Sequence, residues 1–210
     1  MGKKATVITY GCQMNVNESA KMKQMLQTIG YDITEDIKDS DLVLLNTCTV
    51  REGAASKVYS KLSNLKHLKE KRKGKMIIGV TGCLAQEVRD DFIKKTPYVD
   101  LVLGNQNIGR IPDLIERIEK GGETHIVAVD DEDELPERID ADFGDDIVAS
   151  ISITYGCNNY CTFCIVPYVR GMERSVPVHE VLRDVKQYTE KGYKEILFLG
   201  QNVNSYGSDL

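Results

Sequence analysis

The chain has 210 residues, of which 41% are hydrophobic and 28% are charged, as expected for a globular protein of one or two domains. No apolar stretch approaches the roughly 18 residues that a transmembrane helix needs, and the N-terminus has no apolar signal-peptide region. Six cysteines in a chain of this length do not indicate a small disulfide-stabilised secreted protein, so we expect free thiols in a reducing cytoplasm.

The charge is unevenly distributed along the chain. The formal net charge is −5, but residues 130–146 alone hold ten acidic residues and one arginine. The rest of the chain is therefore slightly basic, and net charge neither favours nor excludes a nucleic-acid partner. We predict that 130–146 is an exposed acidic linker between a domain at 1–129 and a second one at 147–210.

The first domain alternates between short apolar runs and helical patterns. Strands are predicted at 6–10, 41–45, 76–80 and 101–103, and helices at 17–29, 54–71, 86–95 and 108–120. This alternation predicts an α/β fold with a doubly wound, mostly parallel sheet covered on both faces. After the linker, a strand at 147–153, a helix at 178–191 and a strand at 195–199 predict one βαβ unit.

Three separate cysteines, Cys12, Cys48 and Cys83, each follow a predicted strand by two or three residues. The carboxyl ends of parallel strands line one edge of a sheet, so the three thiols should converge there. Glycines directly before Cys12 and Cys83 permit tight turns. A free cysteine often packs as a small hydrophobic residue, but three in equivalent positions favour an iron–sulfur site.

A second set, Cys157, Cys161 and Cys164, forms a CxxxCxxC run just after the strand at 147–153. Three thiolates can bind three irons of a 4Fe–4S cube and leave the fourth iron open, as catalytic metal centres do. A redox pair or half of a zinc site is the alternative, but a second CxxC is missing. The run resembles the signature of radical S-adenosylmethionine (SAM) enzymes, including the aromatic Phe163.

The motifs around all six cysteines resemble those of the radical-SAM methylthiotransferases. The similar segments are GCQMN at 11–15, NTCTVRE at 46–52, TGCLAQ at 81–86, and the run from Gly156 to VPYVRG at 166–171. Within that family, QMN at 13–15, VRE at 50–52 and LGQNVNSYG at 199–207 resemble the branch that modifies tRNA. One departure is Val176, where the family usually has an arginine that could contact RNA or SAM.

The resemblance implies methylthiolation of carbon 2 of an isopentenyl-modified adenosine next to the tRNA anticodon, with two 4Fe–4S clusters and SAM. A cluster on Cys157, Cys161 and Cys164 would bind and cleave SAM, and an auxiliary cluster on Cys12, Cys48 and Cys83 would supply sulfur. Flavodoxin or ferredoxin is the expected electron donor, and a monomer is the default expectation for the oligomeric state. Tentative SAM contacts are Phe163, which could instead pack against the barrel, and the strand-end residues Gly200, Gln201 and Asn202.

Other interpretations stay open. The substrate could be another tRNA adenosine derivative or a ribosomal protein, or the chain could be a non-catalytic iron–sulfur protein that binds RNA or senses redox state. The basic run 66–75 could contact phosphates, although a solvated helix end is favoured. The three histidines, His67, His125 and His179, are expected on the surface. Because one βαβ unit cannot complete a barrel, we expect the N-terminal piece of a longer protein, inactive when isolated.

Overall fold

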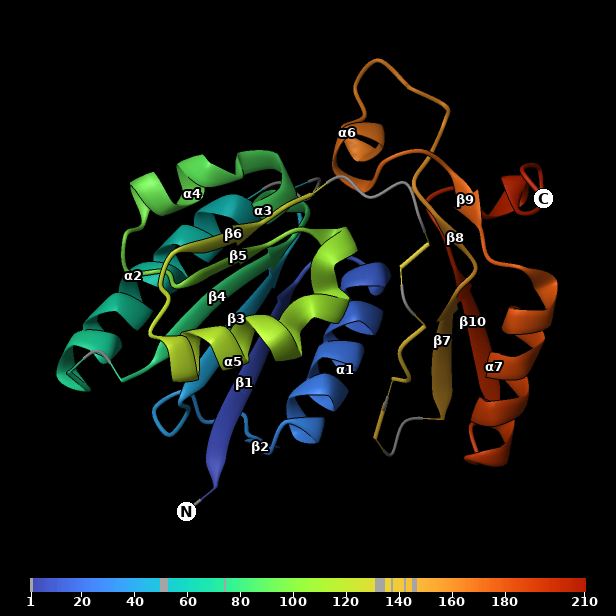
Figure 1. Cartoon of the computed structure of the whole chain (residues 1–210). Helices are drawn as coiled ribbons and strands as arrows, with labels where there is room; N and C mark the ends of the chain where they lie inside the picture. Colours follow the sequence, from blue (N-terminus) through green and yellow to red (C-terminus); the bar gives the residue numbers. More distant parts are fainter. Residues whose placement is uncertain are drawn as a thin grey trace.

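The computed structural model describes residues 2–49, 53–73, 75–130, 135–136, 138–141, 143–144 and 147–210. Its first part is a six-stranded parallel sheet in the order β2-β1-β3-β4-β5-β6 (Figure 1). The strands are β1 (Lys3–Tyr10), β2 (Tyr31–Ile33), β3 (Leu42–Thr47), β4 (Ile77–Gly82), β5 (Leu101–Leu103) and β6 (Ile126–Ala128). The four predicted strands are confirmed. The two edge strands β2 and β6, of three residues each, were not predicted.

Helices cover both faces of this sheet, which confirms the doubly wound fold. One face carries α1 (Gln13–Thr28), the 3-10 helix η1 (Asn105–Arg110) and α5 (Ile111–Gly121). The other carries α2 (Ala54–Lys71), α3 (Cys83–Val88) and α4 (Asp90–Lys95). Alternate residues of β3 enter opposite cores: Leu44 packs with the α1 face, and Val43 and Leu45 pack with the α2 face.

The helix predicted at 86–95 is two short helices, because Arg89 between them adopts a positive φ of 51° that no continuous helix allows. The helix predicted at 108–120 begins earlier, as η1. Its α-helical part, α5, lies on the same face as α1, whereas α2 lies on the opposite face (Figure 1). The β5–α5–β6 and β3–α2–β4 connections run in the same direction across the sheet. They therefore have opposite hands. The β1–α1–β2 and β4–α3–β5 connections share the hand of β3–α2–β4, so β5–α5–β6 is the exception.

The second part is the predicted βαβ unit. In it, β7 (Val148–Ser152) pairs in parallel with β10 (Glu195–Leu199) across α7 (Val178–Glu190). A two-residue antiparallel pair, β8 (Thr154–Tyr155) with β9 (Arg174–Ser175), lies beside it, together with α6 (Val166–Arg170) and the 3-10 helix η2 (Val203–Ser205). Val176 is fully buried in the core of this unit, so its position is one where an apolar side chain packs rather than one that faces a ligand.

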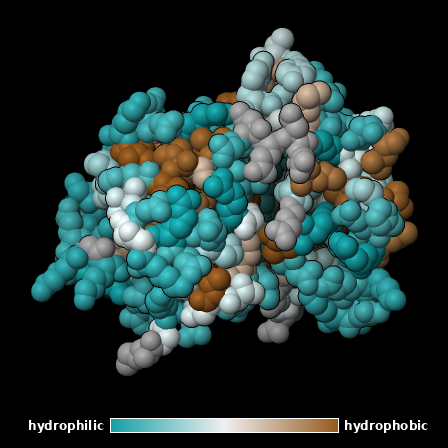
Figure 2. Space-filling model, viewed as in Figure 1, coloured by the Kyte–Doolittle hydropathy of each residue, from teal (hydrophilic) through white to brown (hydrophobic). Residues whose placement is uncertain are grey.

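Hydrophobic side chains also remain on the outer side of this second unit (Figure 2). They include Val178 and Leu182 of α7 and Leu197 and Phe198 of β10, all exposed. None of the described helices combines the length and the apolar composition that crossing a lipid bilayer requires.

The acidic segment 130–146 was predicted as an exposed and partly ordered linker, and its described residues are exposed at Asp130 and Asp140 but attached elsewhere. Ala141 is buried, its N–H donates to the Tyr188 hydroxyl at 3.1 Å, and the N–H of Phe143 donates to the Tyr193 hydroxyl at 3.1 Å. Arg138 donates to the Ser152 carbonyl at 3.0 Å and pairs with Asp184. Composition suggested exposure because acids dominate, but spaced apolar residues and main-chain hydrogen bonds attach the segment to α7 and β7.

Candidate metal centres

Three cysteines lie at the carboxyl edge of the main sheet, and we call Cys12, Cys48 and Cys83 the strand-edge cysteines. Their strands β1, β3 and β4 are direct neighbours, with Tyr10 opposite Thr47 and Thr47 opposite Gly82. Because β3 and β4 extend further than predicted, Cys48 and Cys83 follow them immediately, and Cys12 follows β1 by two residues. Cys48 and Cys83 are buried and Cys12 is half-buried. The structure thus brings all three to one edge, at the switch point of the doubly wound sheet.

Glycine at position 82 is what allows this turn from strand to helix. Its φ of +95° with ψ of −168° lies in a region that is essentially restricted to glycine. A Cβ there would also stand 2.2 Å from the Thr47 carbonyl oxygen, inside the neighbouring strand. The chain therefore turns between β4 and Cys83 with the two backbones in close contact.

Amide side chains hold the strand-edge cysteines. Asn15 Oδ1 accepts from the backbone N–H of Cys12 at 3.1 Å and from its Sγ at 3.3 Å. Asn15 and Asn46 then bond to each other, with Asn15 Nδ2 donating to Asn46 Oδ1 and Asn46 Nδ2 donating to the Asn15 carbonyl, both at 2.9 Å. All of Asn15 and Asn46 is buried, so these bonds fix the start of α1 against β3.

The third thiol is in contact with the second unit. Asn105 Nδ2 donates to Cys83 Sγ at 3.6 Å and to the Val169 carbonyl of α6 at 3.0 Å. Burial raises the pKa of the Cys83 thiol, while the positive charge of Arg170 acts in the opposite direction. Cys83 therefore has cationic and amide donors beside its sulfur, the surroundings in which thiolates are stabilised as ligands.

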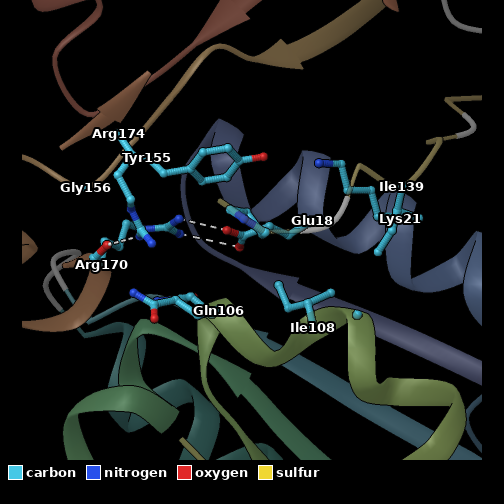
Figure 3. Close-up of a pocket in the computed structure, with 12 residues that line it drawn as sticks. Glu18, Lys21, Gln106, Ile108, Ile139, Tyr155, Gly156, Arg170 and Arg174 are labelled. Atoms are coloured by element: carbon cyan, nitrogen blue, oxygen red, sulfur yellow. Dashed lines mark hydrogen bonds and ion pairs between the residues drawn. The ribbon is translucent and has the colours of Figure 1, made fainter. Parts of the chain in front are cut away.

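Arg170 belongs to a buried ion pair between the two parts of the chain. Its Nη1 lies 2.7 Å from Glu18 Oε1 of α1, and the two side chains are 6% and 8% exposed (Figure 3). Burial alone would lower the pKa of Arg170, but the charges of Glu18 and Cys83 outweigh it and the pKa is raised. Next to this pair, Asn17 Nδ2 donates to the Ser150 carbonyl of β7 at 2.7 Å.

A cavity of about 40 Å³ lies beside the ion pair, between the two parts of the chain (Figure 3). Lys21 of α1, Gln106 and Ile108 of η1, and Tyr155 of β8 line it together with Arg170. The hydroxyl of Tyr155 and Oδ1 of Asn105 are buried and have no hydrogen-bond partner among the described residues. The space is large enough for water, which could serve both atoms.

The second cysteine set lies on the loop between β8 and α6, and we call Cys157, Cys161 and Cys164 the loop cysteines. Cys157 is buried, Cys164 half-buried and Cys161 exposed. Gly156 has a φ of +72°, and a Cβ there would lie 2.0 Å from the Met172 carbonyl oxygen. The Cys157 N–H donates to the Gly171 carbonyl at 3.2 Å, and the Cys164 N–H to the Cys161 carbonyl at 2.9 Å. The loop is thus fixed at its base and open at Cys161.

The residues predicted to contact SAM lie on this loop and at the carboxyl end of β10. Phe163 is 91% exposed, so it does not pack against the second unit. Gly200 directly follows β10, and a Cβ there would lie 2.1 Å from Thr154 Oγ1. Thr154 Oγ1 and Gln201 Oε1 are buried without hydrogen-bond partners among the described residues. Asn202 is half-buried at the start of η2. Orphaned polar atoms beside a glycine with no space for a side chain suit a polar ligand at this strand end.

Both sets fit iron–sulfur clusters by the chemistry of their donors, three thiols each, with nitrogen donors beside the strand-edge set. Among the described residues, no three His, Cys, Asp or Glu side chains are placed to hold a single metal ion. This is compatible with a cluster, because each thiolate of a 4Fe–4S cube binds a different iron.

The basic run 66–75 lies away from these sites. Lys69 pairs with Asp100 at 2.6 Å and Arg72 with Asp41 at 2.7 Å, and both acids precede strands at the amino edge of the sheet. The charges of Lys69 and Arg72 are thus paired within the protein, which favours the interpretation as a helix end over a phosphate contact for these two residues. His67, His125 and His179 are exposed, as predicted. The predicted motif residues 50–52 lie outside the described residues.

Comparison with known proteins assigns a family to each part. Residues 4–104 match the model described as "Uncharacterized protein family UPF0004", and residues 151–209 match the radical SAM superfamily. The protein called tRNA-2-methylthio-N(6)-dimethylallyladenosine synthase in Fusobacterium nucleatum is 66% identical over 99% of this chain. The protein of the same name in Clostridium tetani is 46% identical over 96% of it. The chain belongs to the radical-SAM methylthiotransferase family.

The chain spans about half the length of those relatives, 47% and 45% respectively. Among solved structures, the radical SAM methyltransferase TsrM from Kitasatospora setae superposes with a TM-score of 0.60 at 11% identity, covering 96% of this chain and 48% of TsrM. The cobalamin-dependent SAM radical enzyme OxsB gives 0.57 at 14% identity, covering 95% of this chain and 34% of OxsB. At such identities the likeness establishes the fold alone, a sheet domain followed by the start of a radical SAM domain.

Sequence reasoning missed the polar groups that join the two parts of the chain. Arg170 lies in a motif used for the family resemblance, but its contact with Glu18 was not foreseen. One signal was present in α1, where the consecutive polar residues Asn17, Glu18 and Ser19 point to several sides of the helix. All three are buried in the structure. A polar run that spans several helix faces indicates that a second surface covers the helix.

Proposed function

We propose that the protein to which this chain belongs methylthiolates carbon 2 of an isopentenyl-modified adenosine next to the anticodon of a tRNA. The observation that carries the proposal is the presence of two three-cysteine sets on one chain, at the carboxyl ends of two parallel sheets joined by a buried ion pair. The names of relatives at 66% and 46% identity support tRNA as the substrate. Another tRNA adenosine derivative and a ribosomal protein are the rival substrates.

In this proposal the strand-edge cysteines hold an auxiliary 4Fe–4S cluster, and the loop cysteines hold the 4Fe–4S cluster that binds SAM. When bound, these cofactors supply the radical chemistry and the sulfur that side-chain acids and bases cannot. The residues of the chain orient and shield them. Asn15 and Asn105 fix Cys12 and Cys83. Phe163, Gly200, Gln201 and Asn202 would contact SAM at the open side of the loop.

We further propose the division into an auxiliary-cluster domain at 1–129, an acidic connecting segment at 130–146 and the first part of a radical SAM domain at 147–210. The first listed relatives are about twice as long as this chain, so more of the SAM domain and the substrate-binding parts would lie outside it. A one-electron donor such as flavodoxin or ferredoxin, a cytoplasmic location and a monomeric state complete the proposal.

Deleting the gene is expected to remove the 2-methylthio group from tRNA adenosine and leave the unmethylthiolated isopentenyl form, because no other step in the proposal inserts sulfur. Nucleoside mass spectrometry of total tRNA measures this loss. The wild-type gene should restore the product, and a gene carrying Cys157→Ala should not. Unchanged tRNA in the deletion strain would favour a ribosomal-protein substrate, or a non-catalytic iron–sulfur protein if SAM cleavage were also absent.

Anaerobic reconstitution of the 210-residue chain with iron and sulfide is expected to load the strand-edge site, because all three strands that carry its cysteines are in this chain. In the triple Ala variant of the loop cysteines, about four irons and four sulfides should remain, with the visible absorption of a cubane cluster. The matched triple Ala variant of the strand-edge cysteines should lose these four irons and four sulfides. Zinc alone, or iron without sulfide, would contradict the site.

A further inference from the structure

The ion pair between Arg170 and Glu18 connects residues 152 positions apart in sequence. Both side chains are buried, and burying two charges costs free energy that their mutual attraction only partly returns. An apolar pair would hold the two parts of the chain together at least as well. The pair therefore points to a role beyond adhesion.

The surroundings of Arg170 indicate that role. α6, which ends in Arg170, packs on α3, which begins with Cys83. Asn105 fixes this contact, since its Nδ2 reaches both the Val169 carbonyl and Cys83 Sγ. Arg170 and Asn105 line the same cavity, and Asn105 contacts the Cys83 sulfur; the charges of the Cys83 and Cys12 thiolates, after that of Glu18, help raise the pKa of Arg170. A guanidinium from the second part of the chain thus faces the strand-edge thiols of the first, and Glu18 holds it there.

We propose that Arg170 and Glu18 set the reduction potential of the auxiliary cluster, with Arg170 as a positioning residue whose charge crosses the domain interface. The inference rests on the proposed function, because it requires a cluster on the strand-edge cysteines. A reduced cluster carries one more negative charge than an oxidised one, and a fixed cation nearby favours it. Arg170 therefore raises the potential, and Glu18, an anion beside the same cation, lowers it.

The location of Arg170 links the two metal sites. Its helix α6 begins two residues after Cys164, at the end of the loop that holds the SAM-binding set. The auxiliary site therefore has Arg170 beside it only when the second part of the chain is packed against α1. The charge next to one cluster is carried by the segment that holds the other.

The test is a redox titration of the full-length protein, monitored by electron paramagnetic resonance, in a background with Cys157, Cys161 and Cys164 replaced by Ala. Only the auxiliary cluster remains in this background. Arg170→Gln is expected to lower the equilibrium constant for reduction of the auxiliary cluster about tenfold. For a one-electron couple this is a shift of about 59 mV to lower potential. Glu18→Gln is expected to shift the potential in the opposite direction. Arg170→Lys should retain most of the wild-type value, since it keeps the charge.

If the ion pair were merely structural, losing either partner would disturb the site in the same way. The two variants would then shift the potential in the same direction, not in opposite directions. Arg138→Gln is the matched control. Arg138 is a half-buried arginine that also connects two segments of the chain. Its partners are Asp184 and the Ser152 carbonyl rather than the strand-edge thiols. The auxiliary cluster of the Arg138→Gln variant should have the same reduction potential as that of the parent background, in which only the loop cysteines are replaced. If Arg170→Gln does not retain a cluster, the inference is decided by the direction of the potential shift in Glu18→Gln and by the potential of Arg170→Lys.

Equal potentials in all variants, or shifts of one sign, would overturn this inference and leave the proposed function intact. Absence of any cluster from the parent background would instead contradict the strand-edge site itself. Chemical analysis of iron and sulfide in each sample separates these two failures.

Discussion

Replacing Cys157, Cys161 or Cys164 by Ala in the full-length protein is expected to abolish formation of 5′-deoxyadenosine from SAM. Each of these thiols would bind one iron of the cluster whose open site receives SAM, and two thiolates cannot hold that cluster with the same geometry. The methylthio product should disappear together with 5′-deoxyadenosine. Liquid chromatography of one reaction mixture, with tRNA nucleosides and 5′-deoxyadenosine quantified together, measures both outputs.

The strand-edge cysteines provide the matched comparison. Alanine at Cys12, Cys48 or Cys83 should leave SAM cleavage measurable while sulfur insertion is lost, because these thiols lie on a different sheet edge from the loop set. Near-native circular dichroism is the condition for comparing the variants. If both sets lost both outputs equally in folded protein, the division into a radical-generating site and a sulfur-donating site would be wrong.

Gly82→Ala is expected to be among the most destabilising single changes near the strand-edge site. The position combines a backbone conformation restricted to glycine with a Cβ that would stand 2.2 Å from a main-chain oxygen of β3. Each effect costs between 1 and 3 kcal/mol, so we expect a loss of about 4 kcal/mol in the free energy of unfolding. Urea denaturation measures that loss, and iron analysis should show reduced loading at the strand-edge site.

Gly30→Ala is the control for this variant. Gly30 has a similar φ of +88°, but a Cβ there would meet nothing within 4 Å. Only the conformational cost applies, so we expect a loss of about 1 kcal/mol and normal cluster loading. Equal losses for the two variants would show that the close contact between β4 and β3 does not determine the stability of the edge.

The parts of the fold that could be predicted are those with a local sequence signal. β1, β3 and β4 are apolar runs flanked by helical patterns, and each is followed by a cysteine, so both the sheet and its cysteine edge could be derived from the sequence. The edge strand β2 contains the charged residue Asp32 and therefore has no continuous apolar run. The edge strand β6 is an apolar run as short as β5, and it was overlooked. In the acidic segment, the abundance of carboxylates concealed the apolar spacing that attaches it to α7.

The contacts that join the two parts of the chain could not be predicted for a different reason. Glu18 and Arg170 have ordinary local sequences for a helix start and a helix end, and their pairing exists only because two sheets are packed with α1 between them. Asn105 likewise follows β5 as an unremarkable loop residue, yet it contacts both Cys83 and α6. The polar run at residues 17–19 indicates that a second surface covers α1, but it does not identify the partner, because the pairing depends on tertiary packing over a long sequence separation.

The unusual hand of the β5–α5–β6 connection has a consequence for how the chain folds. Connections of that hand are rare, because a right-twisted strand followed by a helix returns to the sheet most easily on the other face. The helix α5 lies on its face in contact with α1, and the two share one hydrophobic core. The first helix made during synthesis is thus the surface on which the last helix of that domain docks. Strands β3 to β6 without α1 would lack part of the hydrophobic core that α5 shares, so we expect the later half of the domain to depend on α1 for its stability.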